Sequence, residues 1–294
     1  MFEGIRSPAI HTPHTIGEAL SILARMPSAL IWAGGTYIMS RPSYYGTQSP
    51  ANIIDLSQIP DLSKITRNDR AVEIGAMVTA DQLLSTGRLL LSDLLLETLK
   101  SISSPLCRRQ FTIGGALCTP DIRLSIPTAL SVMDASAEIR SLQGNRTTTK
   151  WVSVSRLYDK DGSLLLPPKT ILTKVRISLD TPDFQRFRVI DEPMYAPRHS
   201  VQFAFHCQTS QGVLSKVRFC FAYPVAGIHQ SREMEALLNS LALPLGPARI
   251  RKLSYQIIGE ITKAHPAVTP LQMERSRRLF EAVFHDIDSL AMEK

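Results

Sequence analysis

The stretch Ile31-Trp32-Ala33-Gly34-Gly35-Thr36-Tyr37 places two glycines directly after a short apolar run that predicts a buried strand. Paired glycines let the backbone come close to a ligand and turn successive main-chain N–H groups inward. Such a concave row of donors suits a phosphate or a pyrophosphate, and Thr36 adds a hydroxyl donor. One turn of this kind is weak support for a ligand, because a tight structural turn needs the same residues.

A second paired-glycine turn, Thr112-Ile113-Gly114-Gly115-Ala116, follows two cations, Arg108 and Arg109. It repeats the donor arrangement of the first turn with positive charge nearby, which again favours an anionic ligand. The sequence lacks the G-x-G-x-x-G fingerprint of dinucleotide-binding folds and the G-x-x-x-x-G-K-[ST] loop of P-loop ATPases. It also lacks H-E-x-x-H and G-x-S-x-G, which argues against two common kinds of hydrolase.

Hydrophobic periodicity divides the rest of the chain into helices and short strands. A capping box at Thr15 and Glu18 predicts the start of the first helix, because each side chain can bond the other residue's main-chain N–H. Further helices are expected from Thr79 and over 89–102, with three more after Ser231. The other expected strands are 52–56, 71–76, 137–141, 147–151, 171–177, 201–209 and 213–221. This order of elements indicates the α+β class, and the turn cluster Thr181-Pro182-Asp183 predicts a domain boundary.

The chain has 294 residues, a length typical of about two domains, and its 44% hydrophobic residues exclude disorder as the main state. The formal charge of +7 is spread along the chain, so we expect no nucleic-acid partner. Cys107, Cys118, Cys207 and Cys220 form no C-x-x-C pair, so neither a zinc site nor an iron–sulfur cluster is expected. The most apolar stretch, 89–99, is too short to span a bilayer, and the first ten residues lack a signal-peptide core. We therefore expect a cytoplasmic protein with no membrane span.

Five segments of the chain form an ordered set of motifs. They are I-W-A-G-G-T at 31–36, I-I-D-L-S-Q-I-P-D-L at 53–62, I-G-A-M-V-T at 74–79, T-I-G-G at 112–115 and L-P-P-K-T-I-L at 166–172. The set resembles A-G-G-T, I-D-L-S-x-I-P-x-L, I-G-A-x-x-T, T-I-G-G and L-x-P-x-E-I-L of the FAD-binding subunits of molybdenum hydroxylases. That is the xanthine dehydrogenase and carbon monoxide dehydrogenase family. The order and nearly the spacing agree, and the chain from about Val201 resembles the small α+β domain that ends these subunits.

The resemblance implies a bipartite FAD-binding domain over residues 1–180, split near 50–60, of the type shared with vanillyl-alcohol oxidase. A C-terminal α+β domain of the carbon monoxide dehydrogenase flavoprotein type would follow over 181–294. An extended FAD would lie between the two parts of the first domain, with its pyrophosphate on the glycine turns. The cofactor contacts that the resemblance assigns are Ile31, Trp32, Ala33, Gly34, Gly35, Thr36, Tyr37, Ile38, Arg108, Thr112, Ile113, Gly114, Gly115, Ala116, Asp121, Ser125 and Leu172. Because the flavin carries the redox chemistry, no catalytic acid–base pair and no metal ligand is expected on this chain.

The resemblance also implies that the chain is an oxidoreductase component that needs partner subunits. A molybdopterin-binding large subunit would hydroxylate the substrate. A small subunit with two [2Fe-2S] clusters would carry the electrons to FAD, and NAD or another acceptor would receive them.

Several departures from the family pattern leave alternatives open. Ala116 stands where the family has Asn, Ser125 where it has Asp, and Tyr37 where Asp follows A-G-G-T. Asp121 is a candidate to replace the carboxylate missing at Ser125. A structural subunit that keeps the fold but has weakened or lost FAD binding is therefore one alternative. A stand-alone flavin oxidase is another, against which the C-terminal domain and the lack of a recognisable substrate-site base argue.

Overall fold

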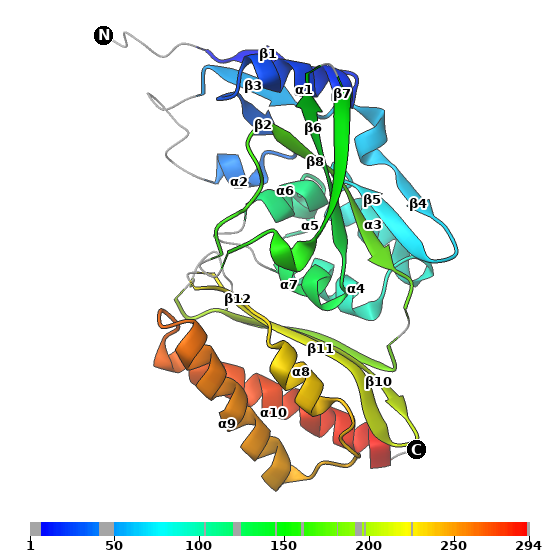
Figure 1. The fold of residues 1–294 in the computed structure, drawn as a ribbon, viewed down its shortest axis with the longest axis vertical. Coiled ribbons are helices and arrows are strands. Elements are labelled where there is room, and N and C mark those ends of the chain that lie inside the picture. The colour runs from blue at the N-terminus through cyan, green and yellow to red at the C-terminus, as the bar shows by residue number, and fades with distance from the viewer. Residues whose placement is uncertain are drawn as a thin grey trace.

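The computed structural model describes residues 7–40, 50–102, 104–119, 125–144, 146–159, 162–180, 182–191, 196, 198–224 and 226–292. Within this part of the chain, three sheets follow one another along the long axis of the molecule, each covered by helices (Figure 1). The mixture of helices and largely antiparallel sheets confirms the predicted α+β class. None of the helices in the described ranges is long and apolar enough to cross a bilayer.

The first sheet is small and parallel, in the order β1-β3-β2. It consists of β1 (Ala9–His11), β2 (Leu30–Trp32) and β3 (Asn52–Asp55), with helix α1 (Ile16–Arg25) packed on it. The Thr15 hydroxyl accepts the Glu18 N–H at 3.1 Å, as the capping box predicts. The Glu18 carboxylate bonds the N–H of His14 at 2.8 Å instead of that of Thr15, so the box closes one residue earlier. Leu20 of α1 and Ile54 of β3 share a buried cluster with Ile171, which joins this layer to the central sheet.

The central sheet has five antiparallel strands in the order β4-β5-β8-β6-β7. They are β4 (Ile65–Arg67), β5 (Ala71–Gly75), β6 (Ser136–Gln143), β7 (Arg146–Ser153) and β8 (Thr170–Ser178). The pair β6 and β7 forms the predicted hairpin, which turns at Gly144 with a φ of 58°. Helices α3 (Ala80–Thr86) and α4 (Asp93–Ser101) pack on this sheet through the largest buried cluster. Helix α4 is shorter than expected because the Ser92 hydroxyl caps its first turn by accepting the Leu95 N–H at 3.3 Å.

Three short helices occupy a region for which the periodicity predicts no element. They are α5 (Pro105–Arg108), α6 (Ile113–Cys118) and α7 (Ser125–Val132), and α2 (Thr36–Met39) is a fourth short helix after the first glycine turn. Helices α2, α5 and α6 are too short for a 3.6-residue period to show. Helix α7 is buried all round from Ile126 to Val132, so its apolar residues define no single face.

The third sheet has the order β12-β11-β10-β9. It consists of β9 (Phe184–Ile190), β10 (Val201–Ser210), β11 (Val213–Tyr223) and β12 (Gly227–His229), and one face is covered by α8 (Arg232–Leu238), α9 (Pro247–Ala264) and α10 (Pro270–Met292). The core on this face is aromatic, with the rings of Phe203 and Phe221 stacked 4.3 Å apart between centroids. Strand β9 was not predicted, because its two apolar anchors, Phe184 and Phe187, lie three residues apart and face opposite sides of the sheet.

The other face of the third sheet packs against α4 and α7 (Figure 1). Phe187, Ala204 and Cys220 form a buried cluster there with Leu94 and Ala129. Strands β8 and β9 belong to different sheets, so the chain passes from the central sheet to the third one close to the predicted boundary. The division into domains 1–180 and 181–294 stays a prediction.

Candidate functional site

Both glycine turns line one cavity of about 430 Å³. The first turn and the start of α2 form one side, and the second turn and the start of α6 form another. The segment 166–172 and the residues that follow β5 complete the lining. Figure 1 shows α2 and α6 on the same side of the molecule, where the first sheet meets the central one. Motifs that lie far apart in the sequence therefore meet around a single space.

The first turn has a shape that only glycine permits. A Cβ on Gly34 would lie 1.6 Å from the main-chain oxygen of Gln110, and a Cβ on Gly35 would lie 2.4 Å from the ring of Trp32. Gly35 also has a φ of 69°, in the left-handed region. The N–H groups of Gly34, Gly35 and Thr36 have no acceptor among the described residues. Three main-chain donors are therefore available at the cavity wall, as the sequence predicts for this turn.

The second turn differs from the expectation, because its N–H groups are already bonded. The Gly115 N–H donates to the Thr112 hydroxyl at 3.1 Å, and the Ile113 N–H donates to the main-chain oxygen of Val78 at 3.0 Å. The Gly114 N–H donates to the main-chain oxygen of Ala76 at 2.8 Å. A Cβ on Gly114 would lie 2.6 Å from the Cβ of Ala76, so this glycine permits close packing. The second turn therefore shapes the cavity wall, but the N–H groups of Ile113, Gly114 and Gly115 are not available to a ligand.

Lys169 is the only charged residue among the described residues that line the cavity. Sequence reasoning missed it and assigned the cationic contact to Arg108, which stands next to the second turn in the sequence. The Arg108 guanidinium instead donates to the main-chain oxygens of Lys100 and Ile102, at 2.9 and 3.3 Å. The last carbonyls of a helix lack partners within the helix and attract cations, and α4 ends there. Lys169 lies in the motif at 166–172, three residues before the predicted contact Leu172. This proximity in the sequence is the signal that could have identified Lys169 as a lining residue.

The other predicted contacts divide into three groups. Those that line the cavity are Ile31, Ala33, Gly34, Gly35, Thr36, Tyr37, Ile38, Thr112, Gly114, Gly115, Ala116 and Leu172. Trp32, Ile113 and Ser125 do not line it: Trp32 packs under Gly35, Ile113 is buried in the core, and Ser125 begins α7. Asp121 lies outside the described residues.

The lining is mostly apolar and carries few titratable groups. Met77, Phe111 and Pro168 add apolar surface that sequence reasoning did not assign. Burial raises the pKa of the Cys118 thiol to about 12, so this lining residue is uncharged at neutral pH. The described lining contains no carboxylate and no imidazole, so those residues form no acid–base pair. An apolar cavity lined by three residues with main-chain N–H groups unpaired in the described ranges and by one cation suits a ligand that combines apolar surface with an anionic group.

Comparison with known sequences and structures identifies the family and the fold of the chain. A family model described as the FAD binding domain in molybdopterin dehydrogenase matches residues 3–179. The putative xanthine dehydrogenase FAD-binding subunit XdhB of Escherichia coli (strain K12) is 25% identical over 260 residues, which cover 85% of each chain.

Another relative is the alpha subunit of the 6-hydroxypseudooxynicotine dehydrogenase complex of Paenarthrobacter nicotinovorans. It is 31% identical over 135 residues, and the chain spans only 45% of the length of this relative. Among solved structures, the Cu,Mo-CO dehydrogenase in its cyanide-inactivated form has a chain of similar fold, with a TM-score of 0.81 and 21% identity. That likeness covers 97% of this chain and 98% of the other, so the fold is shared over nearly the whole length.

Proposed function

Because the chain belongs to the family of FAD-binding domains in molybdopterin dehydrogenases, we propose that it binds FAD in the cavity between its two glycine turns. It would serve as the flavoprotein component of an oxidoreductase of the molybdenum hydroxylase type. The observation that carries the proposal is the convergence of both turns and Leu172 on one cavity.

The residues of the cavity fit FAD. The N–H groups of Gly34, Gly35 and Thr36 would hold the pyrophosphate, and Lys169 would balance part of its charge. Apolar residues such as Leu172 would enclose the flavin ring and exclude water. The bound flavin would supply the capacity to accept and release electrons.

Partner subunits complete the proposal. A molybdopterin-binding large subunit would oxidise the substrate, and a [2Fe-2S] small subunit would deliver the electrons to FAD. NAD or another acceptor would then take them up. XdhB is named as an FAD-binding subunit and the Paenarthrobacter relative as a subunit of a complex, which supports an assembly of this kind. A cytoplasmic location goes with this proposal.

The proposal is tested by mixing the purified chain with FAD, removing free FAD by gel filtration and recording the visible spectrum. We expect a yellow protein that retains about one flavin per chain, because the cavity offers one set of pyrophosphate donors. A chain that leaves the column colourless would contradict the proposal and favour a structural subunit. The double substitution Ala116→Asn and Ser125→Asp would then test whether the departures from the family pattern cause the loss.

A further inference from the structure

Strand β8 carries an irregularity directly beside the cavity. Glu138 of β6 pairs with Lys174 and the next residue, Ile139, pairs with Leu172. Thr173 is therefore an extra residue in β8, a β-bulge. Leu172, which precedes the bulge, lines the cavity, while Lys174 continues the regular sheet.

The bulge changes the side of the sheet to which Leu172 belongs. In a regular strand, residues two apart share a face, so Leu172 would lie on the side of Lys174 and the exposed Arg176. Leu172 is instead buried in the same cluster as Val175 and Ile177. The extra residue at Thr173 therefore allows Leu172 to face the core and the cavity.

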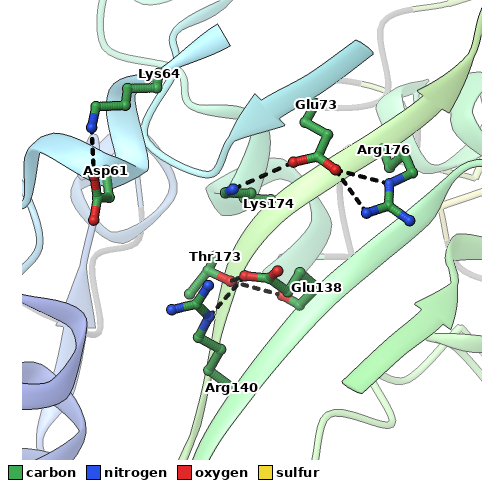
Figure 2. Close-up of polar contacts among 8 residues, drawn as sticks. All are labelled: Asp61, Lys64, Glu73, Glu138, Arg140, Thr173, Lys174 and Arg176. Atoms are coloured by element: carbon green, nitrogen blue, oxygen red, sulfur yellow. Dashed lines mark hydrogen bonds and ion pairs between the residues drawn. The ribbon is translucent and has the colours of Figure 1, made fainter. Parts of the chain in front are cut away.

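A buried carboxylate holds the bulge in place. The Thr173 hydroxyl donates to Oε1 of Glu138 at 2.6 Å, and Nε of Arg140 donates to the same oxygen at 2.8 Å (Figure 2). Thr173 is fully buried and Glu138 is 5% exposed. An unpaired hydroxyl or carboxylate at such a position is costly, so the three groups hold one another in a single geometry.

Main-chain hydrogen bonds link the bulge to the second glycine turn. The main-chain oxygen of Thr173 accepts the Ala76 N–H at 2.9 Å, and the main-chain oxygen of Ala76 accepts the Gly114 N–H at 2.8 Å. Ala76 and Gly114 both line the cavity. A shift of Thr173 would therefore move two parts of the cavity wall, Leu172 on one side and Ala76 with Gly114 on the other.

We propose that Glu138 is a positioning residue of the FAD-binding cavity, which acts through Thr173 on Leu172 and on the second glycine turn. The inference rests on the proposed function of the cavity.

A second carboxylate on the same sheet, Glu73, provides a matched contrast. It pairs with Lys174 at 3.3 Å and Arg176 at 2.7 Å (Figure 2). Among the described residues, Glu73 bonds none that lines the cavity.

The first test is the dissociation constant for FAD, measured by titration of the purified chain. Thr173→Val removes the hydroxyl, and we expect it to weaken FAD binding about ten-fold. Glu138→Gln replaces a charge-assisted bond by a neutral one, with an expected loss of about five-fold. Both should also shift the reduction potential of the bound flavin. Thr173→Ser, which keeps the hydroxyl, and Glu73→Gln should bind FAD as the wild type does.

The double variant Glu138→Gln with Thr173→Val shows whether the two residues act together. If Glu138 acts through Thr173, the double variant binds FAD no more weakly than Thr173→Val alone. Losses that simply multiply, or an equal loss in Glu73→Gln, would overturn the inference.

Amide hydrogen exchange on the chain without FAD tests the same coupling independently of the cofactor. We expect the amides of Ala76 and Gly114 to exchange about ten-fold faster in Glu138→Gln and Thr173→Val than in the wild type and Glu73→Gln. Equal exchange rates in all four proteins would overturn the inference even if the wild type binds FAD. A wild-type chain that binds no FAD would overturn the proposed function, and the exchange rates would still decide whether Glu138 positions the wall.

Discussion

Lys169 is the residue on which the charge of the cavity depends, because the other described lining residues are uncharged. Its side chain is exposed, so its attraction to a pyrophosphate acts partly through water and weakens as salt is added. Arg108 carries the same charge and precedes the second glycine turn in the sequence, but its guanidinium is bonded to the end of α4. The two cations therefore have different expected effects on cofactor binding and on stability.

Substitution of the two cations separates these effects. We expect Lys169→Gln to weaken FAD binding about three-fold at low salt, and the difference to vanish at about 0.5 M salt. Arg108→Gln should leave FAD affinity unchanged and lower the free energy of unfolding by about 1 kcal/mol, because it leaves two helix-end carbonyls without a donor. FAD titrations at two salt concentrations and urea unfolding measure both quantities. An effect of Arg108→Gln on FAD affinity as large as that of Lys169→Gln would contradict this assignment.

Among the elements of the fold, the two glycine turns behave as one unit. Gly34 of the first turn lies against the main chain of Gln110, two residues before the second turn. The part of the cavity wall between β2 and α6 therefore depends on the contact of Gly34 with Gln110, which leaves no room for a side chain at Gly34.

Gly34→Ala tests this unit, because its Cβ would have to displace main-chain atoms. We expect it to lower the free energy of unfolding by about 2–3 kcal/mol and to abolish retention of FAD. Gly259→Ala is the matched control, since nothing lies within 4 Å of the added Cβ and Gly259 is inside α9. It should raise the free energy of unfolding by about 0.5–1 kcal/mol and leave FAD binding intact. Urea unfolding curves measure both changes, and a neutral Gly34→Ala would show that the turns are independent.

The elements that could be predicted from sequence are those with strong local signals. Thr15 caps α1, the β6–β7 hairpin turns at Gly144, and β10 and β11 have long apolar patterns. Elements α5, α6, α7 and β9 could not be predicted, because they are short or buried on several sides. In such segments burial depends on neighbours far away in the sequence, and no period of 2 or 3.6 residues results.

At the scale of the whole molecule, the third sheet is joined to the helices of the central layer. The Phe187 N–H donates to Glu97 at 2.8 Å, and the Leu94 N–H donates to Gln185 at 3.2 Å. Together with the buried cluster around Phe187, these bonds couple the stability of the two parts of the chain. Substitutions that destabilise the third sheet are therefore expected to lower the free energy of unfolding of the whole protein.

Two largely buried imidazoles predict that the protein loses stability in mild acid. Burial lowers the pKa of His206 and of His229 to about 4, and the neighbouring His265 adds to the effect at His229. In an unfolded chain the imidazole pKa is about 6.5. Between about pH 6.5 and pH 4 the unfolded chain therefore binds protons that the folded chain does not. The free energy of unfolding consequently falls as the pH falls through this window.

His229→Asn should remove part of this pH dependence. We expect the loss of unfolding free energy between pH 7 and pH 5 to be smaller by about 2 kcal/mol in the variant than in the wild type. Glu73→Gln serves as a control, because hydrogen bonding by Arg176 lowers the pKa of Glu73, whereas burial lowers that of His229. Urea unfolding at the two pH values measures the difference, and identical pH dependence in His229→Asn and wild type would refute the prediction.

The amino-acid sequence by itself is sufficient to predict the family and the α+β class. It also predicts that the first glycine turn offers main-chain N–H donors. These conclusions rest on local features: paired glycines after an apolar run, a capping box, and motifs in a recognisable order. Local conformation and spacing follow from neighbouring residues, so a sequence contains them directly.

The folded chain is needed to know which groups face the cavity. Lys169 faces it while Arg108 does not, the N–H groups of the second turn are already bonded, and Glu138 holds the bulge at Thr173. Each of these facts depends on contacts between residues that are distant in the sequence, such as Glu138 and Thr173. A polar group bonds whichever partner the packing brings within about 3 Å, and that partner is chosen by the whole fold.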